Sequence, residues 1–512
     1  MFGVAGDPIT PLIHLAESQT GRGIKYYGFR NEQAASYASS AVSFLSQRRR
    51  TGVCLTVAGP GFLNALTGLA NASVNQWPNL LVCPLTNEAE HRASFQYFDQ
   101  VSSLHKGVCK GYFTYTGDDS VKSAILLANT SPFGSVVLFI SVSRTTKFAA
   151  SFFYPPVLPC TLNPPQSNKT LIVIGGAVPM YPETFPVIRS LLNERGGFPF
   201  IADSLARGIL PESHPYCVSA ARSLAMSSCS AVIIIGGRLD WMMLGSMRHS
   251  NCHLTLISDD PVYPSDFDCS RLSLAPMAQL GDLLSHNLES PSPAWVSELI
   301  STAKINRKKY TEKISIFNHG KLPSHLEAIA AIKRALYKTV GLTDALVVSE
   351  GANTMDVARI TLDHIPAPYK RLDAGRWGTM GAGLGYVLAA HAVDPHSPVI
   401  CIEGDSALGF SGMELETIVR YKCKVVIFVF NNGGIYTGKL ENSTAFTPNI
   451  KHDLMMTSFG GTGLSTRGGD AQSVERIADE AFSRFSQGDH PILVDVIINP
   501  DSGLVSGSLS RL

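Results

Sequence analysis

The chain has 512 residues, of which 45% are hydrophobic and 16% are charged, and its formal net charge is +1. This length is enough for about three domains, and the composition is that of a folded globular protein, which excludes a disordered chain. A charge this close to zero gives no indication of a basic surface for nucleic acid, and no apolar run reaches the length of a membrane span. Ten cysteines without a C-x-x-C pair predict buried, reduced thiols of an intracellular protein.

Short β-rich runs alternate with helical periodicity along the chain, in three blocks of similar size. We predict a first domain at residues 1–150, a second at 165–300 and a third at 325–500, followed by a tail at 501–512. The Pro-rich segment 155–169 marks the first linker. Because strands and helices alternate in each block, we expect three doubly wound α/β domains with parallel sheets.

Local patterns predict the individual elements in chain order. Helical periodicity predicts helices at 32–45 and 64–72, and the charged amphipathic stretch 296–338 leads into the third domain. Apolar runs of the kind that buried parallel strands require fall at 53–57, 80–84, 135–140, 171–176, 198–203, 231–237, 254–260, 345–353, 399–402 and 425–430.

The stretch GDSALGFSGMELETIVRYKCKVVIFVFNNGGIYTG, at 404–438, places polar side chains after two successive strands. Asp405, which we expect to be exposed, follows the first strand and Asn432 follows the second, with a helix over 412–421 between them. Open parallel sheets bind ligands at this edge, and carboxylate, amide and carbonyl oxygens suit Mg²⁺, which completes its shell with phosphate oxygens. Ordinary turn chemistry explains Asp405 alone. The spacing of 432 − 405 = 27 residues across a strand–helix–strand unit favours a metal–diphosphate site.

Other glycine-rich segments give little support to competing enzyme classes. GTMGAGLG at 378–385 lacks a G-x-G-x-x-G opening after a strand, and GIYTGK at 434–439 lacks P-loop spacing. No G-x-S-x-G elbow is present in the sequence. These patterns argue against a kinase or a serine hydrolase.

Glu32 opens the predicted helix 32–45 within the sequence RNEQAASYASS. A glutamate in a first helical turn usually only complements the helix dipole. Here the small residues that follow, such as Ala34 and Ala35, favour burial, and a buried carboxylate is a candidate acid or base.

Together these residues resemble the thiamin-diphosphate-dependent enzymes. Asp405 and Ser406 followed by Asn432 resemble the diphosphate/Mg²⁺ motif, Glu32 stands at the place of the activating glutamate, and AGPGFLNALTGLANA at 58–72 is similar to the S-G-P-G segment. The resemblance covers nearly the whole chain and implies pyrimidine-binding, central and diphosphate-binding domains in that order. Within the superfamily the chain resembles the 2-hydroxyacyl-CoA lyase/oxalyl-CoA decarboxylase branch, through the segments 236–243, 350–356, 371–386, 404–421 and 431–438.

The resemblance implies thiamin diphosphate and Mg²⁺ as cofactors and assigns the residues that hold them. The metal ligands would be Asp405, the Asn432 side chain and the Gly434 carbonyl. The other cofactor contacts would be Glu32, Asn353, Met380, Ser406, Ala407 and Gly434. Met380 would be the apolar wedge that keeps the cofactor bent. The alternative, an ordinary core methionine, is compatible with this role.

The resemblance also implies the reaction. Glu32 would hydrogen-bond the aminopyrimidine ring and so promote formation of the thiamin ylide, and Tyr436 would donate a hydrogen bond near the reacting carbon. A lyase would cleave 2-hydroxy fatty acyl-CoA to formyl-CoA and a shortened aldehyde, whereas a decarboxylase would convert oxalyl-CoA to formyl-CoA and CO₂. Phe95 stands where the lyases carry phenylalanine and the decarboxylases tyrosine, which favours the lyase. Arg238 is a candidate contact for a phosphate of the substrate or of a nucleotide.

Partners and location follow from the same resemblance. Acyl-CoA is the implied substrate, and ADP or a similar nucleotide is implied in the central domain. Because Glu32 and Asp405 lie in different domains, the site is expected to form between the subunits of a dimer or homotetramer. The terminal Ser510-Arg511-Leu512 resembles the S-K-L peroxisomal address, with a chance tripeptide and a cytoplasmic protein as the alternative. The eukaryotic lyase acts in fatty acid α-oxidation in that organelle, which favours the address.

Some positions depart from the family pattern. The first domain is expected to be N-terminally short and to lack the usual first helix. Asp7 replaces an apolar residue near the expected thiazolium face, so we expect a buried charge that needs a partner. Arg376 replaces a small residue in the third domain. A truncated, non-catalytic homologue is therefore the competing hypothesis, although the presence of Glu32, Asp405 and Asn432 argues against it.

Overall fold

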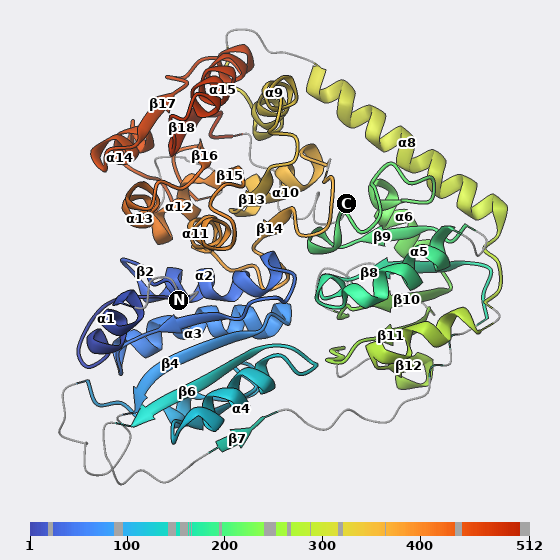
Figure 1. Cartoon of the computed structure of the whole chain (residues 1–512). Helices are drawn as coiled ribbons and strands as arrows, with labels where there is room; N and C mark the ends of the chain where they lie inside the picture. The colour runs from blue at the N-terminus through green and yellow to red at the C-terminus, as the bar shows by residue number, and fades with distance from the viewer. Residues whose placement is uncertain are drawn as a thin grey trace.

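The computed structural model describes residues 1–18, 24–85, 96–141, 150–153, 162, 164, 166–193, 197–239, 252–263, 268–286, 288–315, 321–363, 365–435 and 443–501. These residues form three α/β units, each built around one sheet. In Figure 1 the first unit is blue, the third, in orange and red, lies above it, and the second, in green, lies beside both. The prediction of three α/β domains built on parallel sheets is confirmed.

The first sheet has seven strands in the order β2-β1-β3-β4-β6-β5-β7. All its pairs are parallel except β5 with β7, which run antiparallel at one edge. An antiparallel edge strand on an otherwise parallel sheet is common because an edge position has only one neighbour to match. The elements are β1 (Phe2–Gly3), α1 (Thr10–Ser18), β2 (Tyr27–Gly28), α2 (Glu32–Leu45), β3 (Gly52–Leu55), α3 (Pro60–Asn75), β4 (Asn79–Leu85), β5 (Gly111–Thr114), α4 (Asp118–Ala128), β6 (Ser135–Ser141) and β7 (Ala150–Phe152).

The second sheet has five parallel strands in the order β12-β11-β10-β8-β9. Every residue of β8 and β10 is buried, as expected for central strands covered on both faces. The long helix α8 runs from this unit toward the third one along the outside of the molecule (Figure 1). The elements are β8 (Thr170–Ile174), α5 (Phe185–Asn193), β9 (Phe200–Ala202), α6 (Arg222–Ser228), β10 (Ala231–Ile235), β11 (His253–Ile257), β12 (Leu272–Ala275) and α8 (Pro293–Ser315).

The third sheet has six parallel strands in the order β14-β13-β15-β16-β18-β17. Its central strands β15 and β16 are buried at every position. The elements are α9 (His325–Lys338), β13 (Leu346–Ser349), α10 (Ala352–Thr361), β14 (Arg371–Asp373), α11 (Gly383–Val393), β15 (Val399–Gly404), α12 (Asp405–Ser411), α13 (Glu414–Arg420), β16 (Val425–Asn431), α14 (His452–Ser458), β17 (Thr462–Ser465), α15 (Ala471–Ser486) and β18 (Ile492–Ile497).

Helix α2 has the bounds expected from the sequence. The Asn31 side chain caps it by accepting a hydrogen bond from the Gln33 N–H at 2.8 Å. Its small residues allow close packing, so α3 lies on one side and α11 of the third unit on another. The helix expected over 412–421 is shorter than predicted, because Gly412 and Met413 separate α12 from α13.

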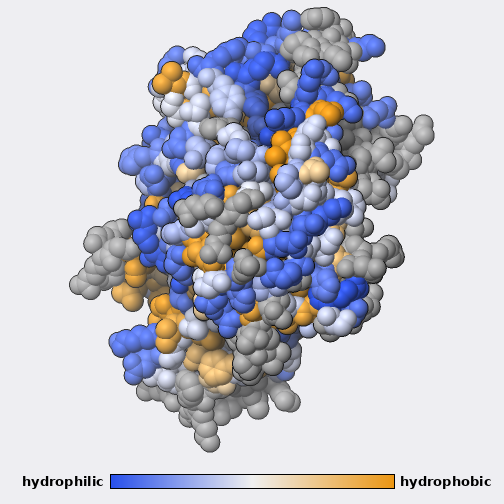
Figure 2. All heavy atoms as spheres, turned by 90° about the vertical axis from the view of Figure 1, so that its right-hand side faces the viewer, coloured by the Kyte–Doolittle hydropathy of each residue, from blue (hydrophilic) through white to orange (hydrophobic). Residues whose placement is uncertain are grey.

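Hydrophilic side chains predominate on the face that carries the second unit, with apolar patches between them (Figure 2). Among the described residues, no helix is both long and apolar enough to cross a membrane. The eight cysteines whose side chains the structure describes are free and buried, which confirms the prediction of buried thiols.

Candidate functional site

Asp405 and Asn432 meet at the carboxyl edge of the third sheet, because β15 and β16 are paired neighbours. The Asp405 Oδ2 atom accepts hydrogen bonds from the backbone N–H groups of Asn432 and Gly434 at 3.1 Å each and of Gly433 at 3.0 Å. The structure therefore brings together the two side chains whose spacing in the sequence predicted a common site.

Asp405 is buried, with 4% of its surface exposed, so the expectation of an exposed acid is wrong. The residue opens α12, and the turn 432–434 covers its carboxylate. Burial raises the pKa of Asp405, while the Ser406 N–H and the charge of His452 act in the opposite direction. Within the described parts of the chain, no lysine or arginine forms an ion pair with this carboxylate.

This donor set fits the expected metal. A buried carboxylate without a lysine or arginine paired to it needs a counter-charge. The side-chain oxygen of Asn432 lies next to this carboxylate, because the Gly434 N–H donates to both Asp405 Oδ2 and Asn432 Oδ1. Hard oxygen donors of this kind suit Mg²⁺ bound to a diphosphate. The residues present are therefore able to hold a metal–diphosphate group.

The other expected diphosphate contacts lie around the same edge of the sheet. Ser406 and Ala407 belong to the first turn of α12, where the Ser406 N–H donates to Asp405 Oδ1 at 2.7 Å. Asn353 is half-buried in the first turn of α10, and α10 packs against β15. Backbone N–H groups at such helix starts favour anions.

Met380 is half-buried, and the turn that follows it is held by Glu350, a residue that the sequence did not single out. Glu350 follows β13 and is 1% exposed. Its carboxylate accepts hydrogen bonds from the N–H groups of Gly381 and Gly383. The position of Met380 therefore depends on a buried carboxylate.

A second buried glutamate, Glu403, lies against the same turn. A Cβ added at Gly383 would lie 1.8 Å from Glu403 Oε1 and 2.9 Å from Glu350 Oε2, so only glycine fits there. Burial raises the pKa of Glu350 to about 7. Burial and the neighbouring Glu350 charge raise the pKa of Glu403. Two carboxyl groups this close do not both ionise readily in a buried site.

Glu32 lies in the first unit, at the start of α2, and is half-buried rather than fully buried. Its Oε2 atom accepts a hydrogen bond from Asn64 Nδ2 at 3.2 Å. Gly61 faces the same carboxylate, since a Cβ there would lie 3.1 Å from Glu32 Oε1. The segment 58–72 that supported the resemblance is thus the neighbour of Glu32. Asn64 lies within that segment, but nothing in its local pattern marks it as a partner of Glu32.

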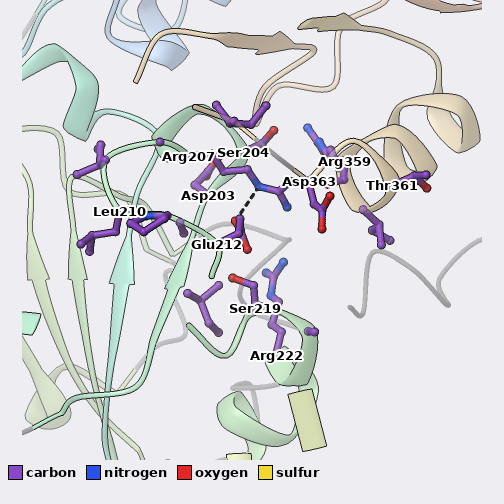
Figure 3. A pocket seen from close by; sticks show the side chains of 18 of the residues that line it. Asp203, Ser204, Arg207, Leu210, Glu212, Ser219, Arg222, Arg359, Thr361 and Asp363 are labelled. Carbon is purple, nitrogen blue, oxygen red and sulfur yellow. Dashed lines mark hydrogen bonds and ion pairs between the residues drawn. The ribbon is translucent and has the colours of Figure 1, made fainter. Parts of the chain in front are cut away.

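A cavity of about 1320 Å³ lies between the second and third units and reaches Met380. Side chains after β9 face side chains of α10 across it (Figure 3). Arg207 forms an ion pair with Glu212 at 3.4 Å and donates a hydrogen bond to the Arg359 carbonyl on the opposite wall. The arginine and lysine residues of the described lining are Arg189, Arg207, Arg222, Arg307, Lys333 and Arg359.

Arg376, which departs from the family pattern, joins the second and third units. Its Nε atom donates to Asp203 Oδ2 at 3.0 Å, and each of the two residues is 8% exposed. Asp203 follows β9 and Arg376 follows β14. The arginine therefore has a structural partner within the chain.

The remaining expected residues have different outcomes. Arg238 pairs with Asp260 beyond the end of β11. Asp7 is exposed, so the expected buried charge at this position is wrong. Phe95 and Tyr436 lie outside the described residues.

Comparison with known proteins identifies the family. Residues 1–103 match the family described as thiamine pyrophosphate enzyme, N-terminal TPP binding domain, and residues 350–496 match the corresponding C-terminal TPP binding domain. The chain is 32% identical to an oxalyl-CoA decarboxylase of Escherichia coli (strain K12), over 100% of this chain and 94% of that protein. It is 33% identical to 2-hydroxyacyl-CoA lyase 1 of Mus musculus, over 98% of this chain and 92% of that protein. It is 31% identical to a 2-hydroxyacyl-CoA lyase of Arabidopsis thaliana, over 100% and 95%. The chain therefore belongs to the thiamin-diphosphate-dependent enzymes, in the branch of the oxalyl-CoA decarboxylases and 2-hydroxyacyl-CoA lyases.

Proposed function

We propose that this enzyme is a 2-hydroxyacyl-CoA lyase that cleaves 2-hydroxy fatty acyl-CoA to formyl-CoA and a shortened aldehyde. The observation that carries the proposal is the cavity of about 1320 Å³, which extends from Met380 to the basic side chains of the second unit. A coenzyme A thioester has an anionic phosphate end and a neutral reactive end, and such a cavity accommodates both.

The chain's own residues supply binding and orientation, and thiamin diphosphate supplies the carbanion chemistry when bound. We assign Asp405, Asn432 and the Gly434 carbonyl to Mg²⁺. We assign Asn353, Met380, Ser406 and Ala407 to the rest of the cofactor. Glu32 is assigned to the aminopyrimidine ring, and Tyr436 to a hydrogen bond near the reacting carbon.

The lyase is favoured over oxalyl-CoA decarboxylase by the charge at the cofactor end of the cavity. The segment 375–380 contributes the uncharged Gly375, Gly378 and Met380 to the lining. The cation of this segment, Arg376, is buried and paired with Asp203. An oxalyl group has a free carboxylate that calls for a cation at this end, whereas an alkyl aldehyde does not. The decarboxylase stays the second candidate because the Escherichia coli relative is similar at 32% identity.

The test compares products from two substrates with purified enzyme, thiamin diphosphate and Mg²⁺. We expect aldehyde and formyl-CoA from a long-chain 2-hydroxyacyl-CoA, and little CO₂ from oxalyl-CoA. Rapid release of CO₂ with no aldehyde would establish the decarboxylase instead. Glu32→Gln is the matched control for either reaction, since it keeps the shape of the side chain and removes its charge. A chain that neither turns over nor is stabilised by the cofactors would support the non-catalytic alternative.

We also propose that the site is completed by a second copy of the chain, in a dimer or homotetramer. Leu63, beside Asn64, is 41% exposed, and on the segment after Asp405 Phe410 is 60% and Met413 56% exposed. Apolar side chains next to both parts of the site are the kind that a subunit interface covers. Sedimentation of the wild type and of Phe410→Glu tests this, and an unchanged mass for the variant would oppose it.

Two further assignments complete the proposal. ADP or a similar nucleotide is assigned to the central domain, with Arg238 near its phosphates; isothermal titration with ADP and Arg238→Ala tests it. Peroxisomal import is assigned to Ser510-Arg511-Leu512, which lies outside the described residues. A fluorescent fusion with and without these three residues tests the import, and the same distribution for both would refute it.

A further inference from the structure

The segment that precedes Glu32 is held by a helix of the third unit. Glu414, the first residue of α13, is fully buried. Its Oε1 atom accepts hydrogen bonds from the backbone N–H groups of Arg30 and Asn31, each at 3.0 Å. These are the two residues directly before Glu32 in the chain.

The other oxygen of Glu414 is fixed as well. Thr417, one turn further along α13, donates its hydroxyl proton to Glu414 Oε2 at 2.6 Å. With both oxygens bonded, the carboxylate has a single orientation toward the first unit. Hydrogen bonds to a buried charged acceptor are among the stronger ones in proteins.

The contact reaches Glu32 through the cap of α2. Asn31 is the N-cap residue, and its side chain accepts the Gln33 N–H at 2.8 Å. The bond from Asn31 N–H to Glu414 therefore fixes the residue that starts the helix. Glu32 is the next residue, so its Cα position is set by the same bond.

Two more contacts from α13 and its end hold this segment. The Gly28 N–H donates to the Tyr421 hydroxyl at 2.8 Å, and Arg420 donates to the Gly28 carbonyl at 2.7 Å. The segment from β2 to α2 thus lies along α13, at the boundary between the first and third units (Figure 1).

We propose that Glu414 is a positioning residue for Glu32: by binding the N–H groups of Arg30 and Asn31, it sets where the Glu32 carboxylate meets the cofactor. This inference rests on the proposed role of Glu32. It assigns no contact between Glu414 and the cofactor. Glu414 belongs to the third unit and Glu32 to the first, so the position of Glu32 depends on the contact between the two units.

The chain offers a matched control on the same helix. Glu416 accepts a hydrogen bond from Arg30 Nε at 2.7 Å, so it binds the side chain of the residue whose backbone Glu414 binds. This ion pair is partly exposed, with 46% and 28% of the two side chains accessible. Glu416 also binds the Arg420 side chain. Glu416→Gln therefore removes the charge at this position, while both backbone N–H bonds to Glu414 stay in place.

The experiment measures kcat, KM and the affinity for thiamin diphosphate with Mg²⁺ in Glu414→Ala, Glu414→Gln and Glu416→Gln. A misplacement of about 1 Å costs roughly 100-fold in rate, so we expect kcat of Glu414→Ala to fall by one to two orders of magnitude, with KM little changed. The amide oxygen of Glu414→Gln can still accept both N–H groups, so this variant should recover most of kcat. Glu416→Gln should match the wild type.

A double-variant cycle separates positioning from a general structural effect. If Glu414 acts through Glu32, adding Glu414→Ala to Glu32→Gln should lower kcat by less than about two-fold, because coupled residues are not additive. An equal loss in both backgrounds, or a wild-type kcat in Glu414→Ala, would overturn the proposal. If Glu414→Ala does not fold, Thr417→Val replaces it: a lower kcat at an unchanged melting temperature supports the proposal, and an unchanged kcat opposes it.

A substrate-free readout keeps this test apart from that of the lyase assignment. Near-ultraviolet circular dichroism of the bound cofactor distinguishes its amino from its imino form, which depends on the Glu32 contact. We expect Glu414→Ala to shift this signal toward that of Glu32→Gln, and Glu416→Gln to leave it unchanged. If no substrate is turned over but the signal shifts, the lyase assignment fails and the positioning role stands. A wild-type signal in Glu414→Ala refutes the positioning role.

Discussion

Replacing Asp405 by asparagine and by alanine separates two roles of this side chain, which are holding the turn 432–434 and binding the metal. Alanine removes the carboxylate oxygen that accepts the buried Asn432 N–H, whereas the Gly434 N–H keeps the Asn432 Oδ1 atom as an acceptor at 3.2 Å. An unsatisfied buried donor costs about 1–3 kcal/mol. Since the bond from Gly433 is lost as well, we expect Asp405→Ala to lose about 2–4 kcal/mol of unfolding free energy without cofactor. Asparagine keeps one acceptor oxygen, so we expect a loss of about 1 kcal/mol.

The cofactor response of the Asp405 variants differs from this stability response. At a hundred-fold excess over its dissociation constant, a ligand stabilises a protein by about 2.7 kcal/mol. We expect the wild type to gain this amount with thiamin diphosphate and Mg²⁺, and Asp405→Asn to gain almost nothing at the same concentrations. Denaturant unfolding with and without the cofactors measures both quantities.

Asp495 provides the control for the Asp405 experiment. It is also a buried aspartate of the third unit, and it accepts a hydrogen bond from Asn431 Nδ2 at 3.1 Å. Asp495→Asn should lower the unfolding free energy but keep the gain from the cofactors. Full cofactor stabilisation of Asp405→Asn would refute the metal assignment.

Three further predictions concern buried groups near the site. Arg376→Ala removes the ion-pair partner of the buried Asp203 carboxylate, so we expect a loss of about 3–5 kcal/mol of unfolding free energy in urea. Lys122→Ala, which breaks an exposed ion pair, should change it by no more than about 0.5 kcal/mol, and equal effects of the two variants would contradict the argument. Gly383→Ala drives a Cβ into two carboxyl groups and should lower the melting temperature and weaken cofactor binding, while Gly281→Ala, which meets nothing within 4 Å, should do neither. For Glu350, burial raises the pKa from 4.5 to about 7, so the folded state binds more protons than the unfolded state in this window and the cofactor-free chain should lose stability as the pH rises through it. Glu350→Gln should flatten that dependence of the melting temperature, and an unchanged slope would show that other groups cause it.

The pattern of the sequence predicted the fold well where a local signal was strong. The period of the apolar residues and the small side chains after Glu32 gave α2 with its observed bounds, and the apolar runs gave β15 and β16. The meeting of Asp405 with Asn432 followed from strand order, because parallel neighbours end at the same edge of a sheet. The burial of Asp405 could not be predicted in the same way, because it depends on how the turn 432–434 folds back over the carboxylate.

Contacts between distant parts of the chain could not be predicted in this way. Asn31 and Glu414 are 383 positions apart, and neither residue has a local pattern that names the other. The sequence showed Arg376 only as a charged residue in place of a small one, and its partner Asp203 is evident only in the structure. The cavity also depends on how two units are arranged, which the period of apolar residues does not encode.

The short segment that contains α12 and α13 begins with Asp405 and ends beside the residues that precede Glu32. In the proposed dimer, the Asp405 of one chain and the Glu32 of the same chain serve different active sites. In each chain, the start of this segment then lies in one active site. Its end contacts the residues before Glu32, which serves the other active site. We expect occupancy of the first site by the metal–diphosphate group to change the cofactor affinity of the second, and linkage would make this effect reciprocal. Cofactor binding to the two sites is expected to depart from independent binding, and Glu414→Ala should restore independence.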